Sequence, residues 1–206
     1  MTLRQTSHDG ARLLIVGPQG SGKGTQGVRI AETFGIPAIS TGDVFRAAVA
    51  AGTPLGEQVK AIIESGDLVS DELTSAVVRE RLSQPDAAGG FLLDGYPRNV
   101  AQVMHLDEFL EGRGEAIDSV IELDVPRDES IARLSLRAAE QGRSDDTEDG
   151  IANRLAIYER ETAPILDVYR TRGVVERIDG VGSLDEITGR IVAALEARGL
   201  GRGAAA

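Results

Sequence analysis

Residues 17–25 read "GPQGSGKGT" and follow directly on an apolar run, "RLLIV", at residues 12–16. The segment after them has a helical pattern, so this glycine-rich turn joins a buried strand to a helix. Glycines at such a turn let backbone N–H groups close around a phosphate, and the positive end of the helix adds to the attraction. The spacing from Gly17 to Lys23 is Gly-x-x-x-x-Gly-Lys, the pattern of a phosphate-binding P-loop. We therefore expect Lys23 to reach the outer phosphates of a nucleotide; the alternative is a glycine-rich turn with a chance lysine.

The residue after the lysine departs from the usual P-loop pattern. A Ser or Thr there normally supplies a hydroxyl to Mg²⁺, but this chain has Gly24, and Thr25 carries the hydroxyl one position later. The sequence therefore predicts that Mg²⁺ is bound loosely, largely through water and the nucleotide. Gly24 also disfavours a GTPase switch, as does the absence of an Asn-Lys-x-Asp stretch that would read guanine.

Beyond this loop, short apolar runs alternate with longer helical patterns, which is typical of a parallel sheet covered by helices. The predicted strands are 12–16, 37–40, 91–94, 119–124 and 174–178. The predicted helices lie near 22–34, 71–83, 99–110, 127–140, 148–170 and 183–198. The fold class is therefore α/β, a three-layer P-loop fold with a five-stranded parallel sheet.

Two segments depart from simple alternation of strands and helices. Residues 41–82 have more helical pattern than one crossover needs, which predicts an inserted subdomain. Residues 138–147 are polar without a hydrophobic face, which predicts a short exposed excursion between two helices. Pro164 is expected to bend the helix predicted over 148–170.

Composition excludes several classes of protein. A chain of 206 residues with 41% hydrophobic residues is long enough for one compact domain, and without cysteine it has no disulfide, thiolate zinc site or cysteine nucleophile. A net charge of −11 argues against a nucleic-acid or anionic-membrane partner. Only two of the 22 basic residues are lysines, Lys23 and Lys60, which indicates that the loop needs a compact ammonium. With no long apolar run and no secretory signal in its first ten residues, the protein is expected to be soluble and cytoplasmic.

A second set of anion-binding features follows two other predicted strands. "STGDVFR" at residues 40–46 leaves the second strand, and "LLDGYPRN" at residues 92–99 leaves the third. Open α/β sheets bind ligands at the carboxyl ends of their strands, so Arg46 and Arg98 are predicted to grip one small phosphate from two sides. Taken singly, the first stretch has the alternative of a helix cap and the second that of a turn.

Asp94 ends the third apolar strand and is a candidate for orienting Mg²⁺ and its waters. Its alternative role is to cap the turn that follows. Direct phosphoryl transfer needs alignment and positive charge but no covalent residue. Since His8 and His105 lie outside every motif, neither is assigned a catalytic role.

Five stretches occur together in one order: "GPQGSGKGT", "ISTGDVFR", "GDLVSDEL", "FLLDGYPRNVAQ" and "GRSDD…NRLAIYERETAPILDVY". Together, from about residue 13 to 178, they closely resemble the adenylate kinases. The resemblance implies reversible conversion of ATP and AMP to two ADP by in-line transfer with lid closure, Mg²⁺ entering with ATP. It also implies a monomer with one domain at 11–199, an AMP-binding subdomain at 40–69, a lid at 136–146 and flexible tails at 1–10 and 200–206. The short lid and the lack of cysteine indicate the form without structural zinc.

The resemblance also implies roles for individual residues. Those expected to hold ATP are Gly20, Ser21, Gly22, Lys23, Gly24, Thr25 and Arg137, with the backbone near Gly182 against the adenine. Those expected around AMP are Thr41, Arg46, Asp67, Leu68, Val69, Gly95, Tyr96, Pro97, Arg98, Gln102, Arg143 and Arg154. Those expected to take part in catalysis are Lys23, Asp94, Arg98, Arg133, Arg137, Arg143 and Arg154.

The lid-side arginines have a simple spacing. Arg133 and Arg137 are four residues apart and so share one helix face, while Arg143 lies in the polar excursion and Arg154 on the next helix. The resemblance implies that they clamp phosphates when the lid closes, with Asp145 and Asp146 holding them in place. Their alternative is a salt-bridged surface in an acidic protein.

Substrate choice leaves a close alternative, because uridylate-cytidylate kinases share the P-loop and the aromatic-Pro-Arg-Asn turn. Thr41 and Gln102 favour AMP, since an amide one helical turn after Arg98 pairs with the donor and acceptor of an adenine edge. Gln102 as a solvated helix residue is the alternative. A sensor that binds ATP and AMP without turnover is a rival of another class, and it has less need of cations aimed at a transition state.

Overall fold

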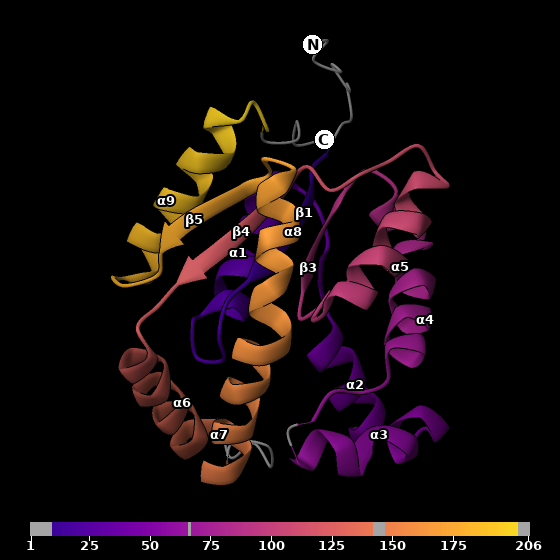
Figure 1. Cartoon of the computed structure of the whole chain (residues 1–206), viewed down its shortest axis with the longest axis vertical. Coiled ribbons are helices and arrows are strands. Elements are labelled where there is room, and N and C mark those ends of the chain that lie inside the picture. Colours follow the sequence, from indigo (N-terminus) through magenta and orange to yellow (C-terminus); the bar gives the residue numbers. More distant parts are fainter. Residues whose placement is uncertain (1–9, 66, 142–146, 202–206) are drawn as a thin grey trace.

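The computed structural model describes residues 10–65, 67–141 and 147–201, apart from the side chains of residues 138–141 and 148. Within these residues one parallel sheet has the order β2-β3-β1-β4-β5 (Figure 1). Its strands are β1 (Arg12–Val16), β2 (Ala38–Ser40), β3 (Phe91–Asp94), β4 (Ser119–Asp124) and β5 (Val175–Asp179). The predicted α/β class and five-stranded parallel sheet are confirmed.

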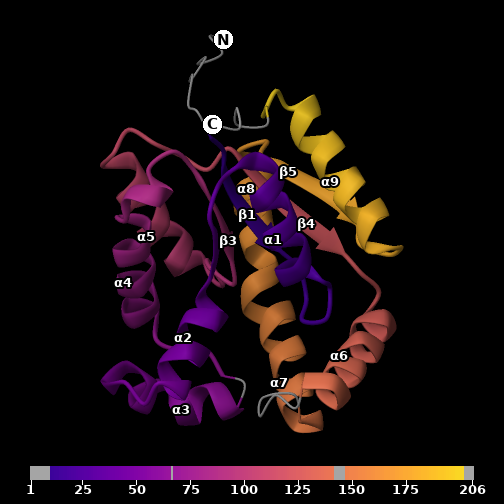
Figure 2. The ribbon, with the colours of Figure 1, turned by 180° about the vertical axis from the view of Figure 1, so that it is seen from behind.

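Each face of the sheet carries its own hydrophobic core, because alternate strand residues point to opposite sides. Leu13 and Ile15 pack on one face with α1 (Lys23–Phe34) and α9 (Leu184–Ala197), the two helices in front of the sheet in Figure 2. Leu14 and Val16 pack on the other face. That face is covered by α4 (Asp71–Leu82), α5 (Val100–Glu111) and α8 (Ala163–Thr171). Three layers result, with β1 buried in the centre.

A third, smaller core lies in the segment predicted as an inserted subdomain. Phe45, Val59 and Val69 form it, and it belongs to α2 (Thr41–Ala50), α3 (Pro54–Ser65) and the approach to α4. Gly56 lets α3 approach α2 closely, since a Cβ there would lie 2.1 Å from the carbonyl oxygen of Ala48. The two helices lie beyond the sheet in Figure 1, and a short 3-10 helix (Pro85–Ala87) leads into β3.

The lid-side helices agree with the sequence prediction, but the predicted excursion begins too early. Helix α6 (Arg127–Gln141) matches the helix predicted over 127–140, and α7 begins at Glu148 and ends at Ile157. Residues 138–141, which were also assigned to the excursion at 138–147, belong to α6 because "AAEQ" consists of strong helix formers that need no hydrophobic face. The rest of the predicted excursion, residues 142–146, lies outside the described residues.

Pro164 interrupts the long helical pattern as predicted. Between α7 and α8 the chain forms a π-helical turn, Tyr158–Thr162, and Pro164 lies in the first turn of α8. Proline has no N–H for the helical ladder, and a wide π turn accommodates the missing bond. Other predicted helix and strand boundaries agree with the structure to within one or two residues.

The carboxyl ends of the strands all face one end of the molecule. Strands β3 and β4 are consecutive in sequence but lie on either side of β1, which makes the end of β1 a switch point where such sheets bind ligands. Helices α2 and α3 lie on one side of this end, and α6 and α7 lie on the other (Figure 1).

Candidate active site

A cavity of about 1080 Å³ opens at this carboxyl end. Its walls come from the loop after β1, from α2, from the turn after β3, and from α6 and α7. Its charged lining comprises seven cations and four carboxylates: Lys23, Arg46, Arg81, Arg98, Arg133, Arg137 and Arg154, with Asp43, Asp67, Asp94 and Glu129. Cations thus outnumber carboxylates in this cavity, although the protein as a whole is acidic.

The loop of residues 17–22 has the conformation that a P-loop requires. Gly20 and Gly22 adopt left-handed backbone angles, with φ of 82° and 87°, and α1 begins directly after them. Gly20 also lies against α6, since a Cβ there would be 2.3 Å from the carbonyl oxygen of Ser130. Within the described residues the buried hydroxyl of Ser21 has no hydrogen-bond partner. The loop therefore directs unsatisfied polar groups and a helix N-terminus at the cavity.

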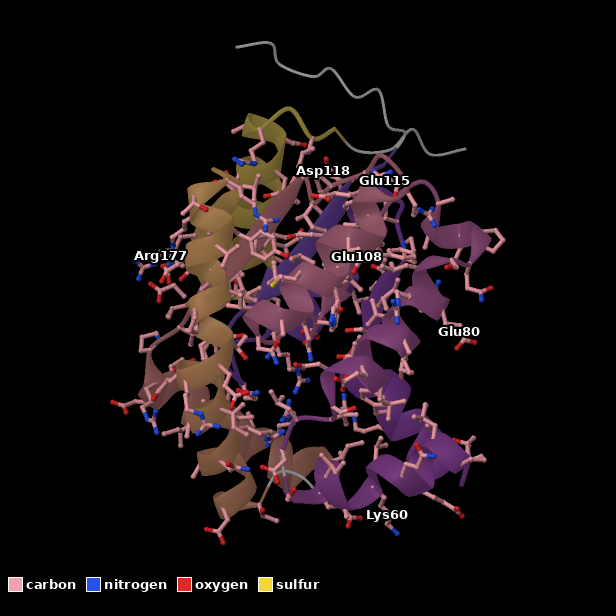
Figure 3. The ribbon with its side chains drawn as sticks, turned by 45° about the vertical axis from the view of Figure 1, so that its right-hand side comes forward. Lys60, Glu80, Glu108, Glu115, Asp118 and Arg177 are labelled. Carbon is pink, nitrogen blue, oxygen red and sulfur yellow. The ribbon has the colours of Figure 1, made fainter. Side chains whose placement is uncertain are left out.

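Lys23 begins α1, and its ammonium donates a hydrogen bond to the carbonyl oxygen of Pro18 at 3.2 Å. Burial lowers the pKa of Lys23 to about 8; the charge of Asp94 opposes this, and the positive charges of Arg98 and other arginines reinforce it. The other lysine, Lys60, is exposed on α3 and points away from the protein (Figure 3). Only the loop lysine lies among other cations, so a bound polyanion would relieve the repulsion there.

Asp94 ends β3 and faces the P-loop. A Cβ at Gly24 would lie 3.5 Å from Oδ2 of Asp94, so the carboxylate lies against the first turn of α1. Within the described residues its buried Oδ1 has no hydrogen-bond partner, which does not support a role in capping the following turn. Burial raises the pKa of Asp94, and the nearby charges of Lys23 and Arg98 counteract that rise.

The turn after β3 fixes the position of Arg98. Its Nε donates to the carbonyl oxygen of Gly95 at 2.8 Å, and the hydroxyl of Thr41 donates to the same oxygen at 2.9 Å. Gly95 has a φ of 81°, and a Cβ there would approach the Thr41 hydroxyl to 2.9 Å. Burial lowers the pKa of Arg98, despite the favourable charge of Asp94. Arg46, one element away on α2, pairs with Asp43.

With this geometry in place, comparison with known sequences is decisive: the family model described as Adenylate kinase matches residues 15–174. The chain belongs to the adenylate kinase family. It is 54% identical over 189 residues to the adenylate kinase of Clavibacter michiganensis subsp. michiganensis (strain NCPPB 382), covering 92% of this chain and 94% of that protein. It is 55% identical over 185 residues to that of Kocuria rhizophila (strain ATCC 9341 / DSM 348 / NBRC 103217 / DC2201), covering 90% and 98%. The adenylate kinase of Stenotrophomonas maltophilia (strain K279a) is 50% identical over 186 residues, covering 90% and 100%.

Membership of the adenylate kinase family makes the chain an enzyme, a phosphotransferase. Its function is that of an adenylate kinase, and the resemblance predicted from the sequence is confirmed. Across residues 10–65, 67–141 and 147–201, no helix has the length and apolar character needed to cross a membrane.

The arginines expected from the adenylate kinase resemblance differ in their surroundings. Arg133 bridges the P-loop and the loop after β5, donating to the carbonyl oxygens of Ser21 at 3.3 Å and Gly180 at 3.1 Å. It also pairs with Glu129 at 2.7 Å on its own helix. Arg137 lies one turn further along α6 and lines the cavity, as does Arg154 of α7. Arg143, Asp145 and Asp146 lie outside the described residues.

The described residues among those expected around AMP line the cavity, with one exception. The cavity lining includes Asp67, Leu68, Val69, Pro97 and Gln102. On the side expected to hold ATP it includes Thr25 and Gly182. Gln102 is only 1% exposed, so it is not a solvated helix residue. Tyr96 does not line the cavity: its ring packs in the core, and its hydroxyl lies 2.9 Å from that of Ser75. An aromatic ring there stabilises the turn from behind.

Two polar residues beside the site have no recognisable signature in the sequence and were not predicted. Gln26, buried on α1, donates to the carbonyl oxygen of Leu184 at 3.0 Å and so joins the P-loop helix to α9. Asp71, at the start of α4, accepts a hydrogen bond from Gln102 at 2.7 Å. Asp71 lies within the stretch "GDLVSDEL". Its contact with the site becomes visible only through its hydrogen bond with Gln102, 31 positions later in the chain.

Proposed function

We propose that this protein transfers the terminal phosphoryl group of MgATP to AMP, reversibly and in line, to give two ADP. The observation that carries the proposal is one cavity lined both by a P-loop with its lysine and by the arginines that follow β2 and β3. Direct transfer requires donor and acceptor phosphates to meet, and a shared cavity meets that requirement. The similar proteins are adenylate kinases by name, which supports the same reaction.

On the donor side, the P-loop binds the ATP phosphates. The free N–H groups at the start of α1 and the ammonium of Lys23 interact with their oxygens. Bound phosphate raises the pKa of Lys23 above its value of about 8 in the nucleotide-free protein, which keeps the ammonium charged during turnover. Arg133 braces the loop from α6, and Gly182 lies on the adenine side.

On the acceptor side, Arg98 and Arg46 bind the phosphate of AMP. Arg98 is aimed by the Gly95 carbonyl, which accepts from its Nε and leaves the other guanidinium nitrogens for phosphate oxygens. Arg46 reaches the cavity from α2, in the segment 40–69 that we propose as the AMP-binding subdomain. Thr41 and Gln102 read the base at the far end of this site.

Between the two sites, Arg137 and Arg154 stabilise the charge on the phosphoryl group in transfer. They approach from α6 and α7, the helices that border residues 136–146, which we propose as the lid. Arg143 of that segment is proposed to join them. A site that closes around both nucleotides excludes water, which would otherwise compete as the acceptor.

Mg²⁺ fits this site as a companion of the nucleotide. The buried Oδ1 of Asp94 has no partner within the described residues, and a carboxylate oxygen suits a hard cation or its water. Residues 10–65, 67–141 and 147–201 contain no group of three or more His, Cys, Asp or Glu that would form a metal site alone. Asp94 would therefore hold Mg²⁺ through water, and the ion would supply charge neutralisation between the phosphates.

The test is an acceptor panel. Purified protein is mixed with MgATP and, separately, AMP, UMP, CMP, GMP and dTMP, and nucleoside diphosphates are separated by chromatography. We expect rapid ADP formation with AMP alone. Preference for UMP or CMP would overturn the assignment of the base, and no turnover with any acceptor would overturn the reaction itself and favour a sensor.

A further inference from the structure

The amide of Gln102 is held at both of its ends by other groups of the protein. Its Oε1 accepts from the backbone N–H of Arg98 at 2.8 Å, and its Nε2 donates to Oδ1 of Asp71 at 2.7 Å. Gln102 lines the cavity, whereas Asp71 stands behind it on α4. One N–H and one lone pair of the amide remain for a ligand.

These two partners allow only one orientation of the amide. A backbone N–H only donates, and a carboxylate only accepts. Turning the amide by 180° would set its NH₂ against the N–H of Arg98 and its oxygen against the carboxylate of Asp71. Both hydrogen bonds would become repulsive contacts at a residue that is 1% exposed, where water does not compensate.

Asp71 is itself fixed by a second amide. Asn99 caps α5, and its Oδ1 accepts from the backbone N–H of Gln102 at 2.9 Å. Its Nδ2 must then point the other way, and it donates to Oδ1 of Asp71 at 2.9 Å. Two N–H groups therefore meet one carboxylate oxygen, which ties the start of α4 to the start of α5.

A fixed amide distinguishes between purines. The edge of adenine offers an N6–H donor and an N1 acceptor, which match the remaining lone pair on Oε1 and the remaining N–H on Nε2 of Gln102. A 6-keto purine, as in IMP or GMP, offers an O6 acceptor and an N1–H donor, so it needs the amide turned over.

We propose that Asp71 is a specificity-determining positioning residue, which locks the Gln102 amide so that the acceptor site takes 6-amino and rejects 6-keto purine monophosphates. This inference rests on the proposed function, in which Gln102 faces the acceptor base. Asp71 acts through Gln102 and does not touch the nucleotide.

The test compares AMP with IMP, which differs from AMP at positions 6 and 1 of the ring and lacks the bulky 2-amino group of GMP. For the parent, Asp71→Ala and Asp71→Asn, kcat and KM are measured for each acceptor with saturating MgATP. Glu72→Ala, an exposed acidic residue in the same helical turn, is the matched control. Dissociation constants of AMP and IMP from calorimetry give the same ratio without turnover, so failure of this inference is distinguishable from failure of the proposed reaction.

Asp71→Ala is expected to lower the AMP to IMP ratio of kcat/KM by about tenfold, the order that one unsatisfied buried hydrogen bond is worth. The kcat with AMP and the KM for MgATP should stay within about twofold, because the phosphate-binding groups are untouched. Asp71→Asn should keep most of the ratio, since its amide oxygen still accepts from Gln102. Both variants lose the negative charge at the start of α4, so an effect of charge alone would change the AMP to IMP ratio equally in the two variants.

A parent that does not discriminate between AMP and IMP would overturn the inference. So would an Asp71→Ala ratio within twofold of the parent, or an Asp71→Asn ratio that falls as far as that of Asp71→Ala. Should Asp71→Ala fail to fold, Asp71→Ser replaces it, because serine suits a helix N-terminus and its hydroxyl is too short to reach the amide.

Discussion

Two arginines at opposite ends of the sheet have opposite surroundings. Arg12 opens β1 at the amino end, where its side chain is 3% exposed and pairs with Glu115 at 3.0 Å and Asp118 at 3.9 Å. These two carboxylates lie at the end of the molecule remote from Lys60 of α3 (Figure 3). Arg98 follows β3 at the carboxyl end, and within the described residues no carboxylate lies within ion-pair distance of it. Its guanidinium donates a hydrogen bond to the carbonyl oxygen of Gly95.

The difference distinguishes an arginine that is paired within the fold from one that we propose binds a substrate phosphate. Arg12 has its counter-charges built into the chain. Around Arg98 a single carboxylate, Asp94, faces several cations, and burial lowers the pKa of Arg98 and of Lys23. In a chain with a net charge of −11, this local excess of positive charge indicates a polyanionic substrate and a site that is less stable than the rest of the protein.

The largest expected effect is on turnover. Arg98→Ala should lower kcat by a hundredfold or more, since Arg98 is proposed to align the attacking phosphate of AMP, and an arginine beside the phosphoryl group in transfer contributes on the order of 10³. Its melting temperature should stay close to that of the parent, because no ion pair is lost. Arg137→Ala should lower kcat by a similar factor. Steady-state rates within threefold of the parent for both variants would remove these arginines from the mechanism.

Replacing Arg12, at the amino end of the sheet, should reduce stability and leave turnover nearly unchanged. Arg12→Met removes the buried guanidinium that pairs with both Glu115 and Asp118 and leaves Glu115 with its exposed-side partner Arg113, and we expect a loss of about 3 kcal/mol in the free energy of unfolding. Denaturant titration measures this loss. The kcat of the folded variant should stay within about twofold of the parent. A tenfold fall in kcat without loss of stability would contradict the division between the two ends.

Gly20→Ala tests how tightly the P-loop lies on α6. The new Cβ would lie 2.3 Å from the carbonyl oxygen of Ser130 at a φ of 82°, so we expect about 2 kcal/mol of destabilisation and a raised KM for ATP. Gly52→Ala is the matched control, since its φ is 63° but a Cβ there meets nothing within 4 Å. An equal loss of stability in the two variants would mean that the close approach of Gly20 to α6 does not account for the destabilisation of Gly20→Ala.

The smallest expected change in stability is that of Lys23→Met, and it depends on pH. The pKa of Lys23 is lowered from 10.5 to about 8 by burial, so its charge destabilises the fold below pH 8. Lys23→Met should therefore abolish turnover yet melt at a temperature about 3 °C higher at pH 7, roughly 1 kcal/mol in a chain of this size. Between pH 8 and pH 10.5 the folded parent has already lost the proton that the unfolded chain retains, so the parent gains stability and the difference shrinks. Equal melting temperatures of parent and variant at pH 7 would contradict the claim that the buried charge of Lys23 destabilises the fold.

Local sequence patterns predicted most of the fold and many of the residues that line the cavity. A signature within ten residues marks each of three features: the P-loop glycines, the strand that ends at Asp94, and the turn that carries Arg98. The predicted excursion began too early, at residue 138 inside α6, because helix formers without an apolar face give no periodicity. The link from Asp71 to Gln102 was out of reach because it depends on how α4 packs against α5. Tyr96 stood in a motif but points into the core, which no spacing reveals.

The central claim is that the cations at the carboxyl end align two nucleotides for one direct transfer. It is tested most directly by the stereochemical course of the reaction, using ATP whose γ-phosphorus is chiral through oxygen isotopes. A single in-line displacement predicts inversion at phosphorus in the product ADP. Retention would require two displacements through a phosphorylated residue, and it would contradict the account.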